Sequence, residues 1–395
     1  MPPKIAPAHN NPRRDRLNNG VTRSPAKRVV HLTCVHTPKD VRIFGKECQS
    51  LSRAGYQVTL VAPGSGSESA GGVRIQGAGT YGSRVRRMSA GAWRVYRLAM
   101  AADGEIYHFH DPELYWVGWL LKCRGKRVIY DAHEDASASM ITKEWIPPFA
   151  RVVISQAVRL LERLTVGIVD RVIAATPKIA ARFPQGKTVI VQNYPIAGEY
   201  GEADGLRYQD RANRIAYVGA ISRLRGAVEM VQAVAQLPAG LGAALDIAGT
   251  FTPASLRAVV ESIPRRECVI DHGQLSRAEV RRVLAQARVG LVLFHPAPNH
   301  VDAQPNKLFE YMAAGLPVLV SAFPGWIRIL QRHECGIAVD PMDVDAIAAA
   351  LQWLLEHGDE AAHMGERGRL AMRELYNWST EEKALVALYR ELAAE

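Results

Sequence analysis

From residue 28 onward, the chain alternates short β-branched runs with longer stretches that have a helical period. In the first half, strand-like runs lie at 28–35, 57–63, 105–110, 127–133, 171–176 and 188–192, separated by helix-like segments that include 45–55 and 149–168. Strands that alternate with helices in this way predict βαβ units and a parallel sheet.

A second alternating series begins after a polar stretch. Residues 193–213 carry glycines and a proline and have neither periodicity, so they are predicted to form a linker. Strand-like runs follow at 214–220, 244–249, 268–273, 289–294 and 317–321. The pattern therefore predicts an α/β protein with two Rossmann-like, doubly wound domains. Ligands of such sheets bind outside the carboxyl ends of the strands, so we expect the site in a central cleft between the domains.

These patterns divide the chain into four parts: a basic tail at 1–27, a first domain at 28–205 that includes the linker, a second domain at 206–375, and a final helix at 376–395. The tail is rich in proline, asparagine and arginine, so it is expected to be disordered. Residues 1–28 hold seven basic side chains and one acid, a large part of the net charge of +10. The tail is interpreted either as a spacer without a partner or as a segment attracted to anionic lipid or nucleic acid.

The spacing of the cysteines and the hydropathy of the chain indicate the cellular compartment in which the protein works. The five cysteines are scattered without a CxxC pair, which argues against a disulfide framework or a zinc site. No apolar run approaches the roughly 20 residues of a spanning helix, and the first residues lack the apolar core of a signal peptide. A cytoplasmic protein is therefore expected.

The stretch 302–321, DAQPNKLFEYMAAGLPVLVS, carries the first candidate chemistry. Pro305 suits the first turn of a helix that Gly315 ends. The amides of Asn306, Lys307 and Leu308 would then form an anion site that the lysine strengthens. Two carboxylates flank this site: Glu310 shares the helix face of Asn306, and Asp302 lies in the preceding loop. Carboxylates beside a phosphate site suit sugar hydroxyls, although a capping acid and a solvated loop acid are the simpler alternatives.

A second candidate lies at 218–230, VGAISRLRGAVEM. A strand ends at Gly219, and Arg223 and Arg225 follow in the loop before the next helix. Two guanidinium groups at this position suit phosphates, whereas an exposed surface pair is the simpler interpretation.

The two stretches resemble motifs of the retaining glycosyltransferases of the GT-B fold, family 4, from about residue 28 to 392. The family's E-x7-E motif is matched by Asp302 and Glu310, and its G-x-x-S-R-x-K-G loop by 219–226. The resemblance implies that Glu310 holds the ribose, that Asp302 and the amides hold the donor sugar, and that Arg223 and Arg225 neutralise the leaving diphosphate. The usual glycine-rich turn after the first strand is replaced by 36–47, HTPKDVRIFGKE.

The first half resembles the family less specifically. The segment 107–114, YHFHDPEL, implies that His110 lies at the donor sugar, and 130–135 with 192–195 resembles capsule and exopolysaccharide enzymes. For His108, His110 and His133, core histidines satisfied by the backbone are the alternative. Asp343 and Asp345 have the spacing of a metal-binding DxD motif, but they precede a helix and are interpreted as its cap. No metal and no cofactor are therefore expected.

The predicted reaction moves a sugar from a nucleotide sugar, with UDP expected rather than GDP, to a saccharide acceptor. In the subgroup that the chain resembles, this acceptor is a lipid-linked saccharide at the inner membrane face. Basic and aromatic residues at 84–98 and 143–153, including Trp93, Tyr96, Trp145 and Phe149, suit an anionic membrane surface, or else the aromatics enter the core. No nucleic-acid motif accompanies them. A GT-B epimerase or phosphorylase, a non-catalytic assembly protein and a nucleic-acid role of the tail are the alternatives.

Overall fold

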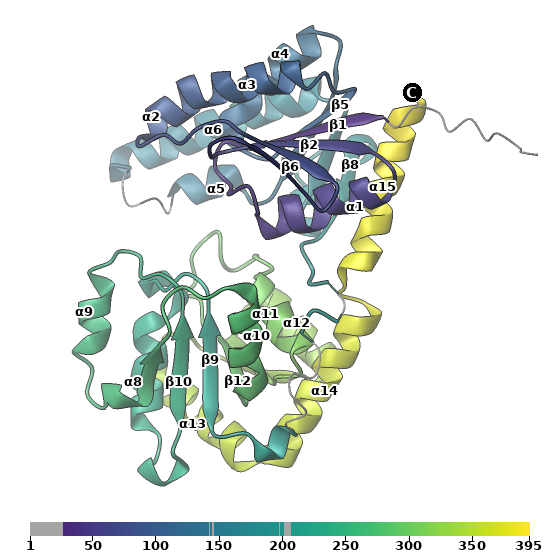
Figure 1. Cartoon of the computed structure of the whole chain (residues 1–395). Coiled ribbons are helices and arrows are strands. Elements are labelled where there is room, and N and C mark those ends of the chain that lie inside the picture. Colours follow the sequence, from purple (N-terminus) through teal and green to yellow (C-terminus); the bar gives the residue numbers. More distant parts are fainter. Residues whose placement is uncertain (1–26, 142, 144–145, 197, 201–206) are drawn as a thin grey trace, which may run out of the picture.

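A computed structural model describes residues 27–141, 143, 146–196, 198–200 and 207–395. It contains two α/β domains, stacked one above the other in Figure 1. All but the last residue of the basic tail and part of the predicted linker lie outside the described residues, as does Trp145.

The first domain is built on a sheet with the strand order β3-β4-β2-β1-β5-β6-β7-β8. The pairs are parallel except for that of β3 with β4. The strands are β1 (Arg28–Leu32), β2 (Gln57–Ala62), β3 (Ser67–Ala70), β4 (Val73–Gly77), β5 (Ile106–Phe109), β6 (Arg127–Ala132), β7 (Arg171–Ala174) and β8 (Thr188–Ile190).

Successive side chains of a strand point to opposite faces, and both faces of this sheet are covered. Val30, Tyr107 and Tyr130 lie in one core with residues of α3 (Ala92–Ala101), α4 (Tyr115–Cys123) and α6 (Pro148–Ile168). Val29 and Ile106 lie in the opposite core, with residues of the π-helix Val41–Cys48, of α1 (Gln49–Arg53) and of α15 (Trp378–Ala394). The first domain is therefore doubly wound, although α15 comes from the end of the chain.

The second domain has a six-stranded parallel sheet with the order β11-β10-β9-β12-β13-β14, which is the classical dinucleotide-fold order. Its strands are β9 (Arg214–Val218), β10 (Ala244–Ala248), β11 (Val269–Asp271), β12 (Val289–Val292), β13 (Val318–Ser321) and β14 (Gly336–Val339). One face packs against α8 (Ala227–Gln236), α9 (Leu256–Glu261) and α13 (Val344–Glu356). The other packs against α10 (Arg277–Gln286), α11 (Asn306–Ala313), α12 (Pro324–His333) and α14 (Gly358–Glu374).

The predicted pair of doubly wound domains is thus confirmed. Asp343 is the cap of α13, because its side chain accepts a hydrogen bond from the Ala346 amide, as predicted from the sequence. Three short helices, α2 (Arg84–Arg86), α5 (Ala136–Ile141) and α7 (Pro177–Ala180), complete the first domain.

The last two helices connect the domains along one side of the molecule. In Figure 1, α14 lies beside the second domain and α15, which follows it, beside the first. Trp378, Leu385 and Tyr389 of α15 are buried in the core of the first domain, and Trp378 Nε1 donates to Ser50 Oγ at 2.9 Å. The final helix therefore belongs structurally to the domain that begins the chain.

We predict that Leu385→Ala destabilises the first domain. Leu385 is fully buried against its sheet, so truncation leaves a cavity and should lower the free energy of unfolding by about 2–5 kcal/mol. Leu370→Ala, on the exposed side of α14, is the control and should change it by less than about 0.5 kcal/mol. Urea unfolding gives the magnitude, and hydrogen exchange read by mass spectrometry gives the place. Equal losses in both variants, or a loss confined to the second domain, would contradict the packing of α15.

Candidate active site

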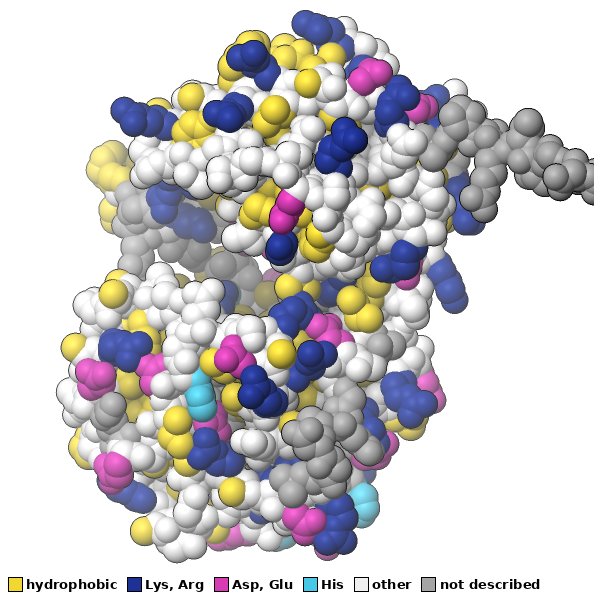
Figure 2. All heavy atoms as spheres, viewed as in Figure 1, with side chains coloured by type: hydrophobic (Ala, Val, Ile, Leu, Met, Phe, Trp, Pro, Cys, Tyr) yellow, Lys and Arg dark blue, Asp and Glu magenta, His cyan; other side chains and the backbone are white. Residues whose placement is uncertain are grey.

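A cavity of about 760 Å³ lies between the two domains, at the carboxyl ends of both sheets. Figure 2 shows the two domains as lobes separated by an indentation. The polar side chains that line the cavity from the first domain include His36, Asp40, Arg42, His133, Lys178 and Arg182, and the lining residues of the second include Gly219, Arg225, Asp302, Asn306, Lys307 and Glu310. Six of the nine site residues predicted from the sequence therefore meet here.

The start of α11 supplies one edge of the cavity. Pro305 has extended backbone and caps the helix, so α11 begins at Asn306, one residue later than predicted. The Leu308 amide donates to Pro305 O at 3.1 Å, and the Leu308 side chain is buried in the core. The amides of Asn306 and Lys307 precede that first hydrogen bond, so they are the ones available to an anion. Leu308 does not line the cavity.

Lys307 crosses directly over Gly219, at the end of β9. Gly219 has φ +122, and a Cβ there would lie 2.2 Å from Lys307 Nζ. A larger residue would push the end of the lysine aside and would strain the backbone at this positive φ. The ammonium also lies 5.3 Å from the centre of the Tyr217 ring, within range of a cation–π contact.

The turn Arg223–Arg225 directs only one of its two arginine side chains into the cavity. Arg225 lines the cavity, with its guanidinium 5.4 Å from the centre of the Phe294 ring. Arg223 is exposed and does not line it, because residues two apart in a single tight turn point in different directions. Gly226 then reverses the chain at φ +72, where a Cβ would lie 2.1 Å from Leu293 O. One guanidinium, rather than the predicted pair, faces the cavity in this conformation.

Positive charge is therefore gathered on the wall of the second domain. Burial, and then the charge of Arg225, lower the pKa of Lys307 to about 7, although the carboxylate of Glu310 opposes this shift. A lysine that loses charge near neutral pH for lack of a counter-charge would regain it beside an anion. The electrostatics thus favour a negatively charged ligand between Arg225 and Lys307.

The two carboxylates of the motif lie apart, as expected. Glu310 lies on α11, and its charge acts on Lys307. Asp302 lies in the loop after β12 and pairs with Lys178 of α7, across the cavity. Both partners are largely exposed, so this ion pair is a weak contact between the domains that a ligand can displace.

His110 does not line the cavity. Its side chain is fully buried, with Nε2 2.9 Å from His31 Nδ1 and Nδ1 3.2 Å from Asp131 Oδ2. Burial, and then the neighbouring His108, lower its pKa. The ring is held by these side-chain partners, not by the backbone as in the alternative interpretation, and it lies behind His133, which does line the cavity.

Several residues of the site were not predicted from the sequence. Arg42 is buried, and its Nη2 donates to Asp131 Oδ1 at 3.0 Å. Lys46 Nζ donates to Asn193 Oδ1 at 2.6 Å and so fixes a lining residue. These contacts join positions that are far apart in the sequence, and the only signal was the basic, polar segment 36–47 that replaces a glycine-rich turn.

Comparison with known proteins defines the class. A model described as "Glycosyl transferases group 1" matches residues 203–371, and one described as "Glycosyltransferase Family 4" matches residues 46–193. The fold is that of the two-domain sucrose-phosphate synthase from Thermosynechococcus elongatus. The chain belongs to the family 4, group 1 glycosyltransferases of GT-B fold, as the resemblance implied.

Individual relatives are distant. The lipopolysaccharide glucosyltransferase WaaG of Escherichia coli is 27% identical over 47% of this chain and 48% of its own length. Sucrose-phosphate synthase from Thermosynechococcus elongatus superposes with a TM-score of 0.74 at 21% identity, over 93% of this chain and 99% of that one. Anabaena HepE in complex with UDP-glucose gives 0.71 at 12%, over 92% and 99%. These structures support the fold.

We predict that Lys307 titrates near pH 7. Competitive labelling with acetic anhydride, followed by mass spectrometry, should give its reactivity a midpoint of about pH 7, with exposed Lys39 as the internal reference. Glu310→Gln should move the midpoint down, because it removes the charge that stabilises the ammonium, and Arg225→Met should move it up. A midpoint that stays the same in both variants would show that neither side chain faces Lys307.

Proposed function

We propose that this protein is a retaining glycosyltransferase that moves a sugar from a nucleotide diphosphate sugar to a hydroxyl group of a saccharide acceptor. The observation that carries the proposal is the cationic wall made by Arg225, Lys307 and the first amides of α11, with Glu310 on the same helix. A diphosphate fits the cations and the amides, whereas a ribose fits the carboxylate.

The donor would lie with its diphosphate between Arg225 and Lys307 and its ribose hydroxyls at Glu310. The sugar would then extend toward Asp302, whose ion pair with Lys178 must break before the carboxylate accepts hydrogen bonds from sugar hydroxyls. Both acids can accept hydrogen bonds from hydroxyl groups without approaching the phosphates.

The chemistry follows from this placement. The bond between the anomeric carbon and the β-phosphate oxygen breaks, and its electron pair stays on the diphosphate. The acceptor oxygen forms the new bond on the same face, and its proton passes to the departing phosphate. Arg225 and Lys307 stabilise the developing charge, so this step needs no metal at the diphosphate.

We further propose UDP as the nucleotide. The support is that the similar structure of Anabaena HepE contains UDP-glucose. The protein has no cofactor in this proposal, because the nucleotide sugar is a co-substrate.

For the acceptor we propose a lipid-linked saccharide of surface polysaccharide synthesis, at the inner face of the cell membrane. A similar relative is named a lipopolysaccharide glucosyltransferase. Among the described residues, no helix has the length and apolar character to cross a membrane. We propose that contact with the lipid surface is peripheral.

One face of the first domain suits such a contact. Along α6, Phe149 is 84% exposed and Val153 is 69% exposed, and further apolar side chains follow on the same helix: Val152, Leu160, Leu164 and Ile168. Trp93 is half exposed, whereas Tyr96 enters the core. Figure 2 shows basic and hydrophobic side chains interspersed on the upper lobe. This mixture suits an anionic lipid surface.

The donor proposal predicts selective stabilisation. One of the UDP, GDP or ADP sugars, with UDP sugars expected, should raise the Tm of the wild type, because a ligand of the native state stabilises it by mass action. Glu310→Gln should reduce the shift. In a transfer assay, Arg225→Met should lower kcat by about 10²–10³-fold.

Glu366→Gln, at an exposed position on α14, is the matched control and should leave the shift unchanged. The absence of a shift with every nucleotide sugar would refute the donor site. A shift without transfer to any acceptor would favour a non-catalytic binding protein.

The membrane proposal predicts binding to anionic vesicles. The full chain should float with vesicles of phosphatidylcholine and phosphatidylglycerol, and Phe149→Glu with Val153→Glu should reduce the bound fraction at least fivefold. Met342→Glu, at an exposed apolar position of the second domain, is the control. Equal binding to neutral vesicles, or equal loss in both variants, would contradict an electrostatic and apolar contact through α6.

A further inference from the structure

Three ligating atoms of the first domain form a nearly equilateral triangle beside the cavity. His110 Nδ1 is 3.1 Å from His133 Nε2 and 3.2 Å from Asp131 Oδ2, and His133 Nε2 is 2.9 Å from the same oxygen. His110 follows β5, Asp131 belongs to β6, and His133 follows β6. Neighbouring parallel strands thus bring the three side chains to one edge of the sheet.

Hydrogen bonds alone explain this triangle poorly. If His110 Nδ1 and His133 Nε2 both carry a hydrogen, two N–H groups must donate to one oxygen of Asp131 from nearly the same direction, and they also point at each other. If one of the two nitrogens carries no hydrogen, its lone pair faces the other N–H or the carboxylate oxygen at about 3 Å. One of the three contacts then has no hydrogen between its two atoms.

A bound cation fits all three contacts. Imidazole and carboxylate ligands lie about 2.0–2.2 Å from a metal such as Zn²⁺. At 90–110° from one another, such ligands are separated by about 2.8–3.6 Å, a range that includes the three separations found here.

A second, independent observation comes from the groups behind the triangle. Glu47 Oε2 lies 3.9 Å from His110 Nδ1, and His108 Nε2 lies 3.7 Å from Asp131 Oδ2. Both atoms are buried, and within the described part of the chain neither makes a hydrogen bond of ordinary length, although both side chains interact with Asp131. Arg42 supplies the positive charge nearest to Glu47 and Asp131, with its Nε 2.9 Å from Glu47 Oε1. A cation would use acceptor capacity that the protein leaves unsatisfied.

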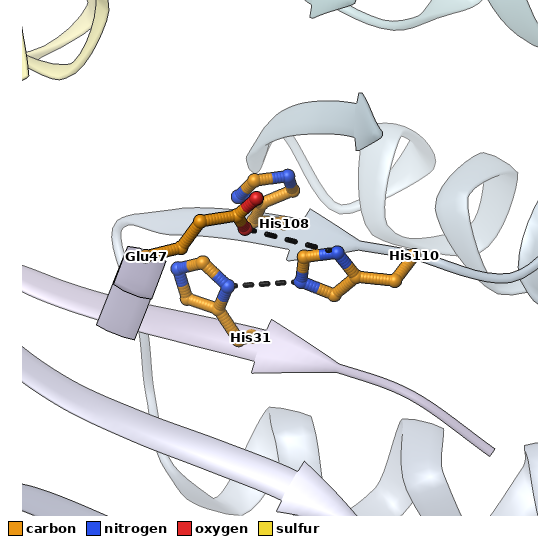
Figure 3. Close-up of side chains that lie close together, drawn as sticks. All are labelled: His31, Glu47, His108 and His110. Carbon is orange, nitrogen blue, oxygen red and sulfur yellow. Dashed lines mark hydrogen bonds and ion pairs between the residues drawn. The ribbon is translucent and has the colours of Figure 1, made fainter. Parts of the chain in front are cut away.

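The outer contacts are those that metal ligands commonly have. Figure 3 shows one ring nitrogen of His110 directed at His31 and the other at Glu47. His110 Nε2 lies 2.9 Å from His31 Nδ1, and His31 Nε2 lies 3.2 Å from the hydroxyl of Tyr389. Such a partner on the second nitrogen fixes the orientation of a ligating imidazole.

We propose that His110, Asp131 and His133 bind a divalent first-row transition ion, of which Zn²⁺ is the expected one, with Glu47 and His108 as further donors. His133 lines the cavity and the other ligands are buried, so the cation would be reached from the cavity. This site departs from the expectation that the protein uses no metal. It lies on the wall opposite Arg225 and does not depend on the proposed function.

The test uses the full chain without an affinity tag, stripped with a chelator and dialysed. Titration with Zn²⁺ alone, followed by calorimetry and elemental analysis, should show one equivalent retained. Co²⁺ should give the visible absorption of a site with nitrogen and oxygen ligands. His133→Gln should weaken Zn²⁺ binding at least 100-fold, and because this side chain is partly exposed, the variant should fold.

His36→Gln is the matched control. Its ring lies on the same cavity wall, 5.3 Å from the His133 ring, but outside the triangle. Zn²⁺ affinity within about threefold of the wild type in this variant, together with the loss in His133→Gln, would support the site. A wild type that retains no stoichiometric metal, or equal effects of the two substitutions, would overturn it. Nucleotide binding enters neither measurement, so the outcome is separate from that of the donor site.

Discussion

On the second-domain wall of the cavity, the structure places two cations, Arg225 and Lys307, close together, with Glu310 and Asp302 as the carboxylates of the same wall. Lys307 crosses Gly219 and lies beside Arg225, and the pKa of this lysine falls to about 7 because burial and the guanidinium both disfavour its charge. Such an arrangement destabilises the free protein and becomes favourable when an anion enters. The conformation of Gly219, the start of α11 and the turn that presents Arg225 all serve to hold these charges in place.

The opposite wall carries both signs of charge, because Arg42, Lys178 and Arg182 line it together with Asp40, Glu134 and Asp135. In the first domain, Asp40 and Asp131 accept hydrogen bonds from neighbouring groups, and burial of Asp131, which would raise its pKa, is outweighed by the charge of Arg42. The proposed orientation of an anionic ligand therefore rests on the adjacent cations Arg225 and Lys307 and the first amides of α11, and not on a difference in net charge between the two walls.

Much of this organisation could be predicted from the sequence, because strand and helix patterns and helix starts are local. The alternation of elements, the start of α11 near Pro305 and the cap at Asp343 depend on neighbouring residues. The burial of His110 could not be predicted, because it depends on His31 and Asp131 from two other strands. The same holds for the pair of Lys178 with Asp302, which joins two domains.

Sequence patterns also fail to predict in which direction each side chain of a single turn points. Arg223 and Arg225 have the same chemistry and are two residues apart, so a motif treats them alike, yet only Arg225 lines the cavity. A guanidinium outside the cavity stabilises a bound diphosphate only through solvent, where the interaction of two charges is several times weaker than in a partly buried site. The charge of the cationic wall in this conformation thus rests on Arg225 and Lys307, with the amides of α11 beside them.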